Sequence, residues 1–289
     1  MLSIITQIAN TTNLISILIF SAIQGILEAF PISSSMHIEL LSNKLAMQTV
    51  PSEILHLGTS IAFTITCWPF IKHRLIFLFR STLKILHQSS TIKNKKTRSL
   101  NHKLACTILG TKNISFNIKI LINLILITLP TIVIGFLIKD VKPEISPLYC
   151  NLAAAISMLL ADLLPARKSI SSINYSSSIL IGLLISLALI PGISRMGITF
   201  TVFRLFQFRR FDALFFTILT GIPITAGAAL IGIIHNINSP FISIYITGSL
   251  LGGIATLLML RITFWMLINC WTIFGAYRIF ISVFMLMKH

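Results

Sequence analysis

Long apolar runs, separated by short polar or charged segments, fill most of this chain. The apolar core of a bilayer is ~30 Å thick and takes ~20 residues of helix, so runs of this length predict membrane-spanning helices. The pattern predicts candidate spans at residues 12–30, 54–71, 120–138, 147–164, 176–190, 212–234, 241–260 and 262–286.

Composition agrees with this pattern, because 55% of the 289 residues are hydrophobic and only 10% are charged. A soluble domain of this length needs a more charged surface, so the apolar excess is expected to face membrane lipid. A formal net charge of +16 would suggest a nucleic-acid partner for a soluble protein. Here the basic residues gather between apolar runs, so we predict no nucleic-acid partner.

The densest basic segment, residues 72–119, predicts the orientation of the chain. It carries eleven Lys or Arg, whereas the turn near residues 140–146 has two, Lys139 and Lys142. Cytoplasmic connections of membrane proteins are enriched in Lys and Arg, so the basic segment is predicted to be cytoplasmic and the turn exterior. Within the basic segment, residues 87–103 are predicted to form a solvated loop.

Residues 176–208 do not fit a simple series of spans. The segment follows the basic pair Arg167 and Lys168 and ends at a second basic cluster, residues 204–210. It is too long for one span and too short for two, and the charges at both ends are expected on the same side. We predict a re-entrant hairpin whose tip is PGISRMG, residues 191–197.

The first apolar run predicts another hairpin, the first along the chain, with the tip PISSSMH at residues 31–37. Residues 37–52 after it are too polar and too short for a span. Two similar tips that enter from opposite faces imply an inverted repeat, with halves at about residues 1–145 and 146–289 of one membrane domain. The predicted fold is an all-α polytopic membrane protein with about six to eight transmembrane helices plus two re-entrant helical hairpins.

Glu28 is the one acid between residues 12 and 36, in an apolar segment without Lys or Arg. An ionisable group at such depth costs ~2.5–3.5 kcal/mol on insertion scales, so it normally faces a polar site. Gln24 lies one helical turn earlier, so both side chains project from one face toward the first tip. Glu28 is therefore a candidate site residue; the alternative is a protonated carboxyl that bonds a neighbouring helix.

The first tip is rich in hydroxyl groups. Ser33, Ser34 and Ser35 follow Pro31, which lacks an N–H and marks the end of the helix. Small hydroxyls and freed backbone donors suit an anion, and His37 could serve as nucleophile, general acid or general base. Serines that bond only their own broken helix are the alternative.

The second tip places a cation in an apolar segment, in the order Gly192, Ser194, Arg195 and Gly197. The glycines would let the backbone approach a ligand closely. No acid lies near Arg195 in the sequence, so its anionic partner must come from elsewhere. This partner is either Glu28 or a substrate phosphate, two of whose oxygens a planar guanidinium can hold at once.

Further polar positions interrupt the apolar runs. Thr199 lies one turn after Arg195 and could add a hydroxyl, although a threonine often bonds its own helix. His56, at the predicted outer start of a span, is a weaker candidate, because histidines at helix ends often bond water. Tyr277 and Arg278 interrupt the last apolar run, and Arg278 is expected to snorkel toward the interface.

Both tips resemble the signatures of the undecaprenyl-diphosphatase family, which is known for bacitracin resistance. Residues 24–37, QGILEAFPISSSMH, are similar to its pattern QGxxExxPxSSSGH, and residues 191–199, PGISRMGIT, to its pattern PGxSRSGxT. Smaller likenesses at residues 56–59, 216–223 and 277–278 occur in the family's order. The resemblance therefore covers nearly the whole chain.

The resemblance implies an activity and a location. The family hydrolyses undecaprenyl diphosphate to the monophosphate and orthophosphate at the bacterial cytoplasmic (inner) membrane, which recycles the lipid carrier for cell-wall synthesis. It also implies a divalent cation, Mg or Ca, for which Glu28 is the candidate ligand. Met36 stands in place of Gly, Ile193 in place of a hydroxyl residue and Met196 in place of Ser. The last two changes would remove phosphate donors from the second tip.

These observations assign expected roles to the residues of both tips. The predicted catalytic residues are Glu28, Ser34, His37 and Arg195. The predicted substrate-binding residues are Gln24, Ser33, Ser35, Gly192, Ser194, Gly197 and Thr199. His37 or a serine would attack the terminal phosphorus or activate water, and Glu28 would hold a cation or transfer protons, while the prenyl tail lies in lipid between helices.

A transporter or flippase for a lipid phosphate or small anion is the main competing expectation. Broken helices and an inverted repeat are equally typical of secondary transporters. A candidate nucleophile beside an anion cradle favours chemistry, since a carrier needs only the cradle. A catalytically weakened relative is a third alternative, and assembly into a homo-oligomer is left open.

Overall fold

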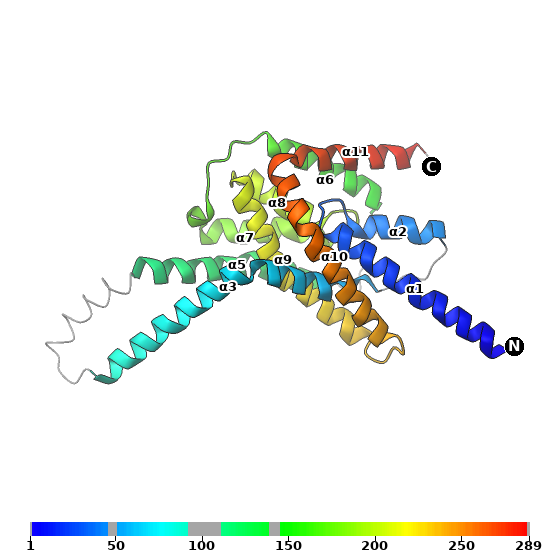
Figure 1. Cartoon of the computed structure of the whole chain (residues 1–289). Helices are drawn as coiled ribbons and strands as arrows, with labels where there is room; N and C mark the ends of the chain where they lie inside the picture. The colour runs from blue at the N-terminus through cyan, green and yellow to red at the C-terminus, as the bar shows by residue number, and fades with distance from the viewer. Residues whose placement is uncertain (1, 46–50, 92–110, 139–144, 288–289) are drawn as a thin grey trace.

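The computed structural model describes residues 2–45, 51–91, 111–138 and 145–287. These residues are mostly helical and contain no β-sheet (Figure 1). The helices are α1 (Leu2–Glu28), α2 (Ser34–Leu45), α3 (Ser52–Thr91), α5 (Thr111–Leu137), α6 (Pro147–Asp162), η1 (Ile170–Ser172), α7 (Tyr175–Ile185), η2 (Ser186–Leu189), α8 (Arg195–Leu205), α9 (Arg210–His235), α10 (Ile242–Asn269) and α11 (Trp271–Leu286).

Several of these helices are suited to a lipid environment. Among the described residues, four helical segments are long and apolar enough to cross a bilayer: Ser52–Arg74, Ile118–Leu137, Arg210–His235 and Ile242–Asn269. Shorter apolar helices accompany them at Leu14–Glu28, Pro147–Asp162, Tyr175–Leu189 and Trp271–Leu286. Large apolar side chains remain exposed along all of them. The prediction of an all-α polytopic membrane protein is confirmed.

The break between the last two helices lies further along the chain than predicted. α10 continues through Arg261 to Asn269, and α11 begins at Trp271 after a break at Cys270. Arg261 is exposed, so its charge can leave the apolar region without ending the helix. The predicted boundary at residues 260–262 is therefore wrong.

The predicted loop at residues 87–103 is also wrong in part. α3 continues as helix to Thr91, well beyond the predicted end of its span at residue 71, and α5 begins at Thr111. Lys, Arg and Leu favour helix, so a basic segment can extend a span without unwinding. The rest of the predicted loop lies outside the described residues.

The hairpin predicted at residues 176–208 is present, and backbone hydrogen bonds join its two ends. Its re-entrant course in a membrane stays a prediction. α7 and η2 lead into the tip and α8 leads out of it. At the base, the backbone N–H groups of Arg167 and Lys168 both donate to the carbonyl of Gln207 at 2.9 Å, and Arg209 N–H donates to the Lys168 carbonyl at 3.0 Å. The chain therefore leaves the hairpin where it entered.

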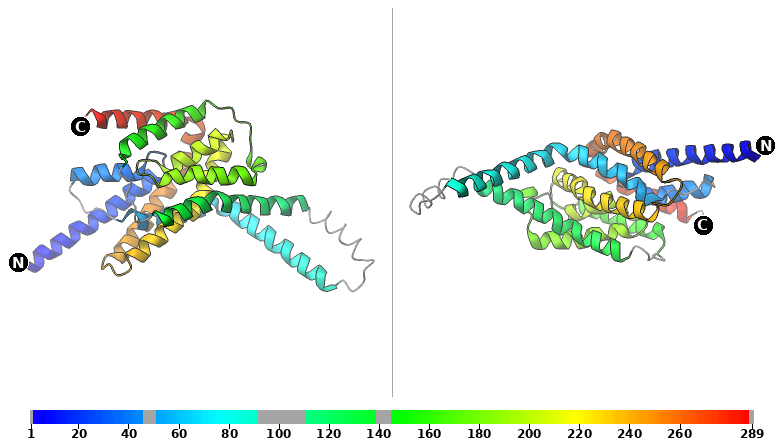
Figure 2. Two further views of the ribbon diagram at one scale, coloured as in Figure 1. Left: turned by 180° about the vertical axis from the view of Figure 1, so that it is seen from behind. Right: turned by 90° about the horizontal axis from the view of Figure 1, so that it is seen from below.

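Neighbouring helices pack lengthwise against one another, and α10 packs against both α1 and α3. α1 packs along α10, α7 packs along α5, and α3 packs along α9 (Figures 1 and 2). Thr256 of α10 donates to the carbonyl of Gly25 at 2.8 Å, and Thr131 of α5 donates to the carbonyl of Gly182 at 3.4 Å. Close approach explains the first glycine, because a Cβ at Gly25 would lie 2.0 Å from the Gly252 oxygen. The inverted repeat and the boundary between its halves stay predictions.

Helix α8 lies inside the bundle, and every side chain from Met196 to Arg204 is buried. Phe203 stacks on Phe216 of α9 with ring centroids 4.9 Å apart. Contacts on all faces hold α8 firmly, so Arg195 at its first position has a fixed location.

Candidate active site

The first tip is a tight turn between α1 and α2. α1 ends at Glu28, and Pro31, which has no N–H to continue a helix, follows within the turn. Ser33 has φ +65°, a left-handed conformation that is uncommon for residues other than glycine, and α2 begins at Ser34. The turn brings the last carboxyl of one helix to the first hydroxyl of the next.

The second tip reverses the chain between η2 and α8. Gly192 has φ +87°, and a Cβ there would lie 2.1 Å from the carbonyl oxygen of Pro147, so the turn requires glycine. The Ser194 hydroxyl caps α8 by accepting a 3.2 Å hydrogen bond from the N–H of Gly197. Arg195 is therefore the first residue of α8.

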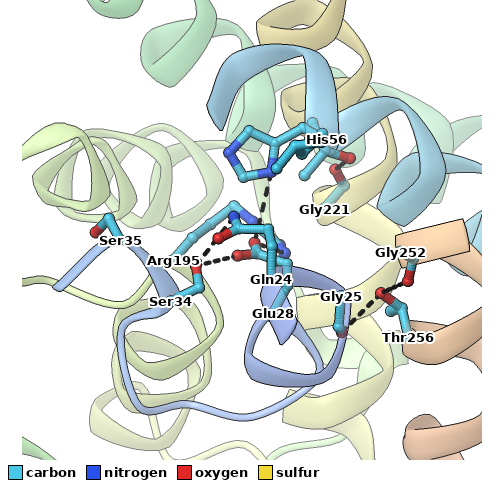
Figure 3. Close-up of polar contacts among 12 residues, drawn as sticks. Gln24, Gly25, Glu28, Ser34, Ser35, His56, Arg195, Gly221, Gly252 and Thr256 are labelled. Atoms are coloured by element: carbon cyan, nitrogen blue, oxygen red, sulfur yellow. Dashed lines mark hydrogen bonds and ion pairs between the residues drawn. The ribbon is translucent and has the colours of Figure 1, made fainter. Parts of the chain in front are cut away.

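The two tips meet at an ion pair (Figure 3). Arg195 Nη2 donates to Glu28 Oε1 at 3.0 Å, and the Ser34 hydroxyl donates to Glu28 Oε2 at 2.6 Å. Only 7% of the Glu28 side chain and 10% of the Arg195 side chain are exposed. The structure confirms the predicted contact between the tips and supplies the expected partner of each charge.

A cavity of about 160 Å³ lies beside this ion pair. Its polar lining consists of Gln24, Glu28, Ser33, Ser34, Ser35, Ser52, His56, Thr131, Ser194, Arg195 and Thr225. Its apolar lining comes from η2, the second tip and α9 and consists of Ala188, Leu189, Ile193, Ile224 and Ala228. Such a lining suits a ligand with a polar head and an apolar tail.

Several buried polar atoms around Glu28 lack a hydrogen-bond partner among the described residues. They are Arg195 Nε and Nη1, His56 Nδ1 and Gln24 Oε1. Buried polar groups are normally satisfied, so this cluster indicates a polar ligand. The free donors of Arg195 suit an anion, and the free oxygen of Gln24 suits a cation or a donor.

Most of the predicted site residues reach this cavity. Gln24, Glu28, Ser33, Ser34, Ser35, Ser194 and Arg195 line it. The lining does not include His37, Gly192, Gly197 or Thr199. Thr199 is buried within α8, and the two glycines shape the second tip.

The His37 ring contacts the C-terminal helix instead of the cavity. Its Nδ1 lies 2.9 Å from the carbonyl oxygen of Ser33, and its Nε2 lies 2.7 Å from the hydroxyl of Tyr277. The ring is also stacked on Tyr277, with centroids 5.8 Å apart. In this arrangement His37 supports the turn at Ser33 and does not face Glu28.

His56 and Arg278 lie closer to the site than the sequence predicts. His56 lines the cavity, and its Nδ1 lies 3.9 Å from Glu28 Oε1. The expected snorkelling of Arg278 is wrong, because its side chain is completely buried and donates to the Gly192 carbonyl at 2.9 Å. A charge in an apolar helix is costly, and this cost marks Arg278 as a residue that needs a partner. A hydrogen-bond partner inside the protein offsets the cost as well as a position at the membrane interface does.

The departures from the family signatures affect the site unequally. Met196 is buried in the core with 1% of its surface exposed, and Met36 lines a separate cavity beside α6 and α11. Neither side chain faces the ion pair. Ile193 does line the main cavity, so the exchange at this position is the one that makes the second tip more apolar.

A divalent cation fits the site only together with a ligand. The described residues contain no group of three His, Cys, Asp or Glu side chains that could hold a metal. Glu28 is the carboxylate of the cavity, and Gln24 Oε1 and the Ser34 hydroxyl are further oxygen donors beside it. Hard cations such as Mg²⁺ are often held by one or two carboxylates and by substrate phosphates, which agrees with this donor set.

Comparisons with known proteins identify the family of this chain. Residues 17–284 match the family described as bacitracin resistance protein BacA. The undecaprenyl-diphosphatase of Pelagibacter ubique is 31% identical over 80% of this chain and 78% of its own length. The undecaprenyl-diphosphatase of Thermosipho melanesiensis is 28% identical over 92% of this chain and 96% of its own length. That of Buchnera aphidicola is 26% identical over 92% and 94%. The chain belongs to the BacA family of bacitracin resistance proteins.

Proposed function

We propose that this protein hydrolyses undecaprenyl diphosphate to undecaprenyl phosphate and orthophosphate in the bacterial cytoplasmic membrane, and so recycles the lipid carrier of cell-wall synthesis. The names of its relatives support this activity. The observation that carries it is the contact of Ser34 with Glu28, 2.6 Å long, beside the unpartnered donors of Arg195. A candidate nucleophile, a candidate base and an anion clamp therefore share one cavity.

Arg195 and two helix ends bind the diphosphate. The guanidinium has free Nε and Nη1 donors, and its planar fork matches phosphate oxygens. α2 begins at Ser34 and α8 begins at Arg195, so the positive ends of two helix dipoles also meet at the cavity. The apolar lining receives the start of the prenyl chain.

Ser34 is the proposed nucleophile. Its oxygen attacks the terminal phosphorus, the bond from this phosphorus to the bridging oxygen breaks, and undecaprenyl phosphate leaves. Glu28 accepts the hydroxyl proton through the bond that it already makes to Ser34. Water then cleaves the phosphoserine and releases orthophosphate. Direct attack by a water held between Glu28 and Ser34 is the alternative that keeps the same residues.

Glu28, with Gln24 and Ser34, would hold a divalent cation when the diphosphate is present. Such a cation would neutralise charge on the phosphate oxygens as the bridging bond breaks. Arg195 remains necessary beside it, because it contacts Glu28 directly and fixes the direction of the carboxylate.

The competing function is a carrier of lipid phosphates, which would share the broken helices and the anion clamp. Detergent-purified protein incubated with undecaprenyl diphosphate distinguishes the two functions. A phosphatase releases orthophosphate in proportion to enzyme and time, whereas a carrier releases none. Ser34→Ala protein, purified in the same way, controls for a contaminating phosphatase.

A further inference from the structure

Arg278 of α11 connects the backbones of both tips. Its Nη1 donates to the carbonyl of Pro31 at 3.3 Å, and its Nη2 donates to the carbonyl of Gly192 at 2.9 Å. Pro31 lies in the first tip, and Gly192 lies in the second. One planar group thus joins two turns that are far apart in the sequence.

The orientation of this guanidinium is itself fixed. Arg278 Nε donates to Asn151 Oδ1 at 2.8 Å, and Asn151 Nδ2 donates to the Ser282 hydroxyl at 2.8 Å. α6, which carries Asn151, packs along α11. The contact sets the plane of the guanidinium, so its two terminal nitrogens point at the two carbonyls.

The positive charge of Arg278 makes no ion pair within the described part of the chain. The salt bridges found there join other residues, and the acceptors of Arg278 are backbone carbonyls, one amide oxygen and the sulfur of Met158. A fully buried charge without a carboxylate is costly, and an apolar side chain could fill the same space. Packing alone therefore does not explain an arginine here.

The absence of a side chain at Gly197 leaves room for the Arg278 guanidinium. A Cβ at this position would lie 2.9 Å from Arg278 Nη1 and 3.4 Å from the Pro31 oxygen. Gly192 is the other tip glycine, and its own carbonyl is an acceptor of Arg278. Gly192 and Gly197 therefore both contribute to the connection that Arg278 makes between the two tips.

We infer that Arg278 is a positioning residue of the active site. It sets the distance between the tips and thereby places Arg195 against Glu28, without contacting the substrate. The inference rests on the proposed phosphatase function. Its expected effect is on turnover, because a tip displaced by about 1 Å can cost about 10²-fold in rate while the substrate still binds.

Arg278→Lys, compared with Arg204→Lys, tests this role. Arg204 is also buried, with 3% exposed, and donates to the carbonyls of Phe208 and Leu164 at 2.7 Å each, at the foot of the second hairpin and outside the cavity. In both variants the lysine ammonium keeps the positive charge. It cannot donate to the acceptors that the planar arginine guanidinium reaches in one plane. Arg278→Lys should lower kcat about 10²-fold with KM changed less than about threefold. Arg204→Lys should keep kcat within about threefold of wild type at a similar loss of thermal stability.

The distance between the tips is measured separately, so that the outcome does not depend on phosphatase activity. Spin labels at Glu39 of α2 and Leu187 of η2, both exposed, are attached in a cysteine-free background. Arg278→Lys should broaden or shift the distance distribution, and Arg204→Lys should leave it unchanged. If Arg278→Lys does not fold, Gly197→Ala, which pushes on Nη1 and keeps the charge, should give the same broadening.

Two results would overturn the inference: an unchanged distance distribution in the Arg278 or Gly197 variant, or equal losses of kcat in Arg278→Lys and Arg204→Lys. Absence of phosphate release by wild-type protein would refute the proposed function instead. In that case the distance measurement still decides whether Arg278 joins the tips.

Discussion

The Ser34 hydroxyl donates a 2.6 Å hydrogen bond to Glu28 Oε2, from the first residue of α2 to the last residue of α1. Arg195 Nη2 donates to Oε1, the other oxygen of the same carboxylate, at 3.0 Å. A phosphate can bind the free Nε and Nη1 donors of Arg195 while Nη2 stays on Glu28, and we expect its negative charge to make Glu28 a stronger proton acceptor for Ser34. Substrate binding would thus activate the nucleophile.

Ser34→Ala is expected to lower phosphate release by at least about 10³-fold, because the attacking oxygen is lost. Ser42→Ala is the matched control, since Ser42 is also in α2 and bonds the Glu39 carbonyl away from the cavity. Acid-quenched wild-type protein should carry label from undecaprenyl diphosphate labelled in its terminal phosphate. Wild-type turnover without any labelled protein would favour direct attack by water.

Gly221→Ala is expected to lower activity by displacing Arg195. A Cβ at Gly221 would lie 2.6 Å from Arg195 Nη1 and 3.0 Å from the Phe63 ring, and Phe63 is fully buried. Overpacking of this kind typically costs about 1–3 kcal/mol, and a displaced clamp should reduce kcat about tenfold or more.

Gly227→Ala on the same helix is the control for this substitution, because a Cβ at Gly227 would meet nothing within 4 Å. It should leave phosphate release unchanged, and both variants are assayed at matched expression. Equal activity of the two alanine variants would show that the position of Arg195 tolerates a shift.

Arg195→Lys should remain folded in the membrane and lose about 10²–10³-fold in turnover, because lysine keeps the charge but loses the fork. His235→Ala is the control, since His235 is exposed at the end of α9, outside the cavity lining. The measurement is orthophosphate release at saturating lipid diphosphate. Near-normal release by Arg195→Lys would make the arginine structural and restore the transporter interpretation.

The polar residues of the two tips could be predicted from the sequence because apolar surroundings make each of them conspicuous. Glu28 and Arg195 are charges in long apolar segments, and each needs a partner, so their contact follows from charge balance. The two ends of the second hairpin could also be predicted, because a basic cluster follows or precedes the apolar segment at each end.

The residues that support the site were harder to predict, because their partners are backbone atoms. Arg278 bonds carbonyls of Pro31 and Gly192, and no sequence pattern marks a carbonyl as an acceptor. The direction of the His37 ring depends on Tyr277, which lies in the last helix. Hydropathy also does not show where a helix ends. α10 continues through the exposed Arg261 and breaks at Cys270, although the charge at Arg261 is the stronger interruption of the apolar run.

The orientation of the chain predicts the side from which the substrate reaches the cavity. Ser52 and His56, at the start of α3, line the cavity, whereas Lys72 lies near the other end of the same span and begins the basic segment. The excess of Lys and Arg predicts that this basic end is cytoplasmic. The cavity should therefore be nearer the exterior face, where the diphosphate would enter.

Single cysteines at Glu53 and Lys72, both exposed, test this orientation in a cysteine-free background. A thiol reagent that does not cross membranes should label Glu53→Cys in intact cells and should label Lys72→Cys only after the cells are opened. Lys168→Cys, at the foot of the second hairpin, should behave like Lys72→Cys, because both ends of that hairpin are predicted to be cytoplasmic. Labelling of Lys72→Cys from outside, with Glu53→Cys protected, would reverse the topology and place the cavity toward the cytoplasm. Phosphate release by the three variants should match wild type, which shows that each labelled protein is folded.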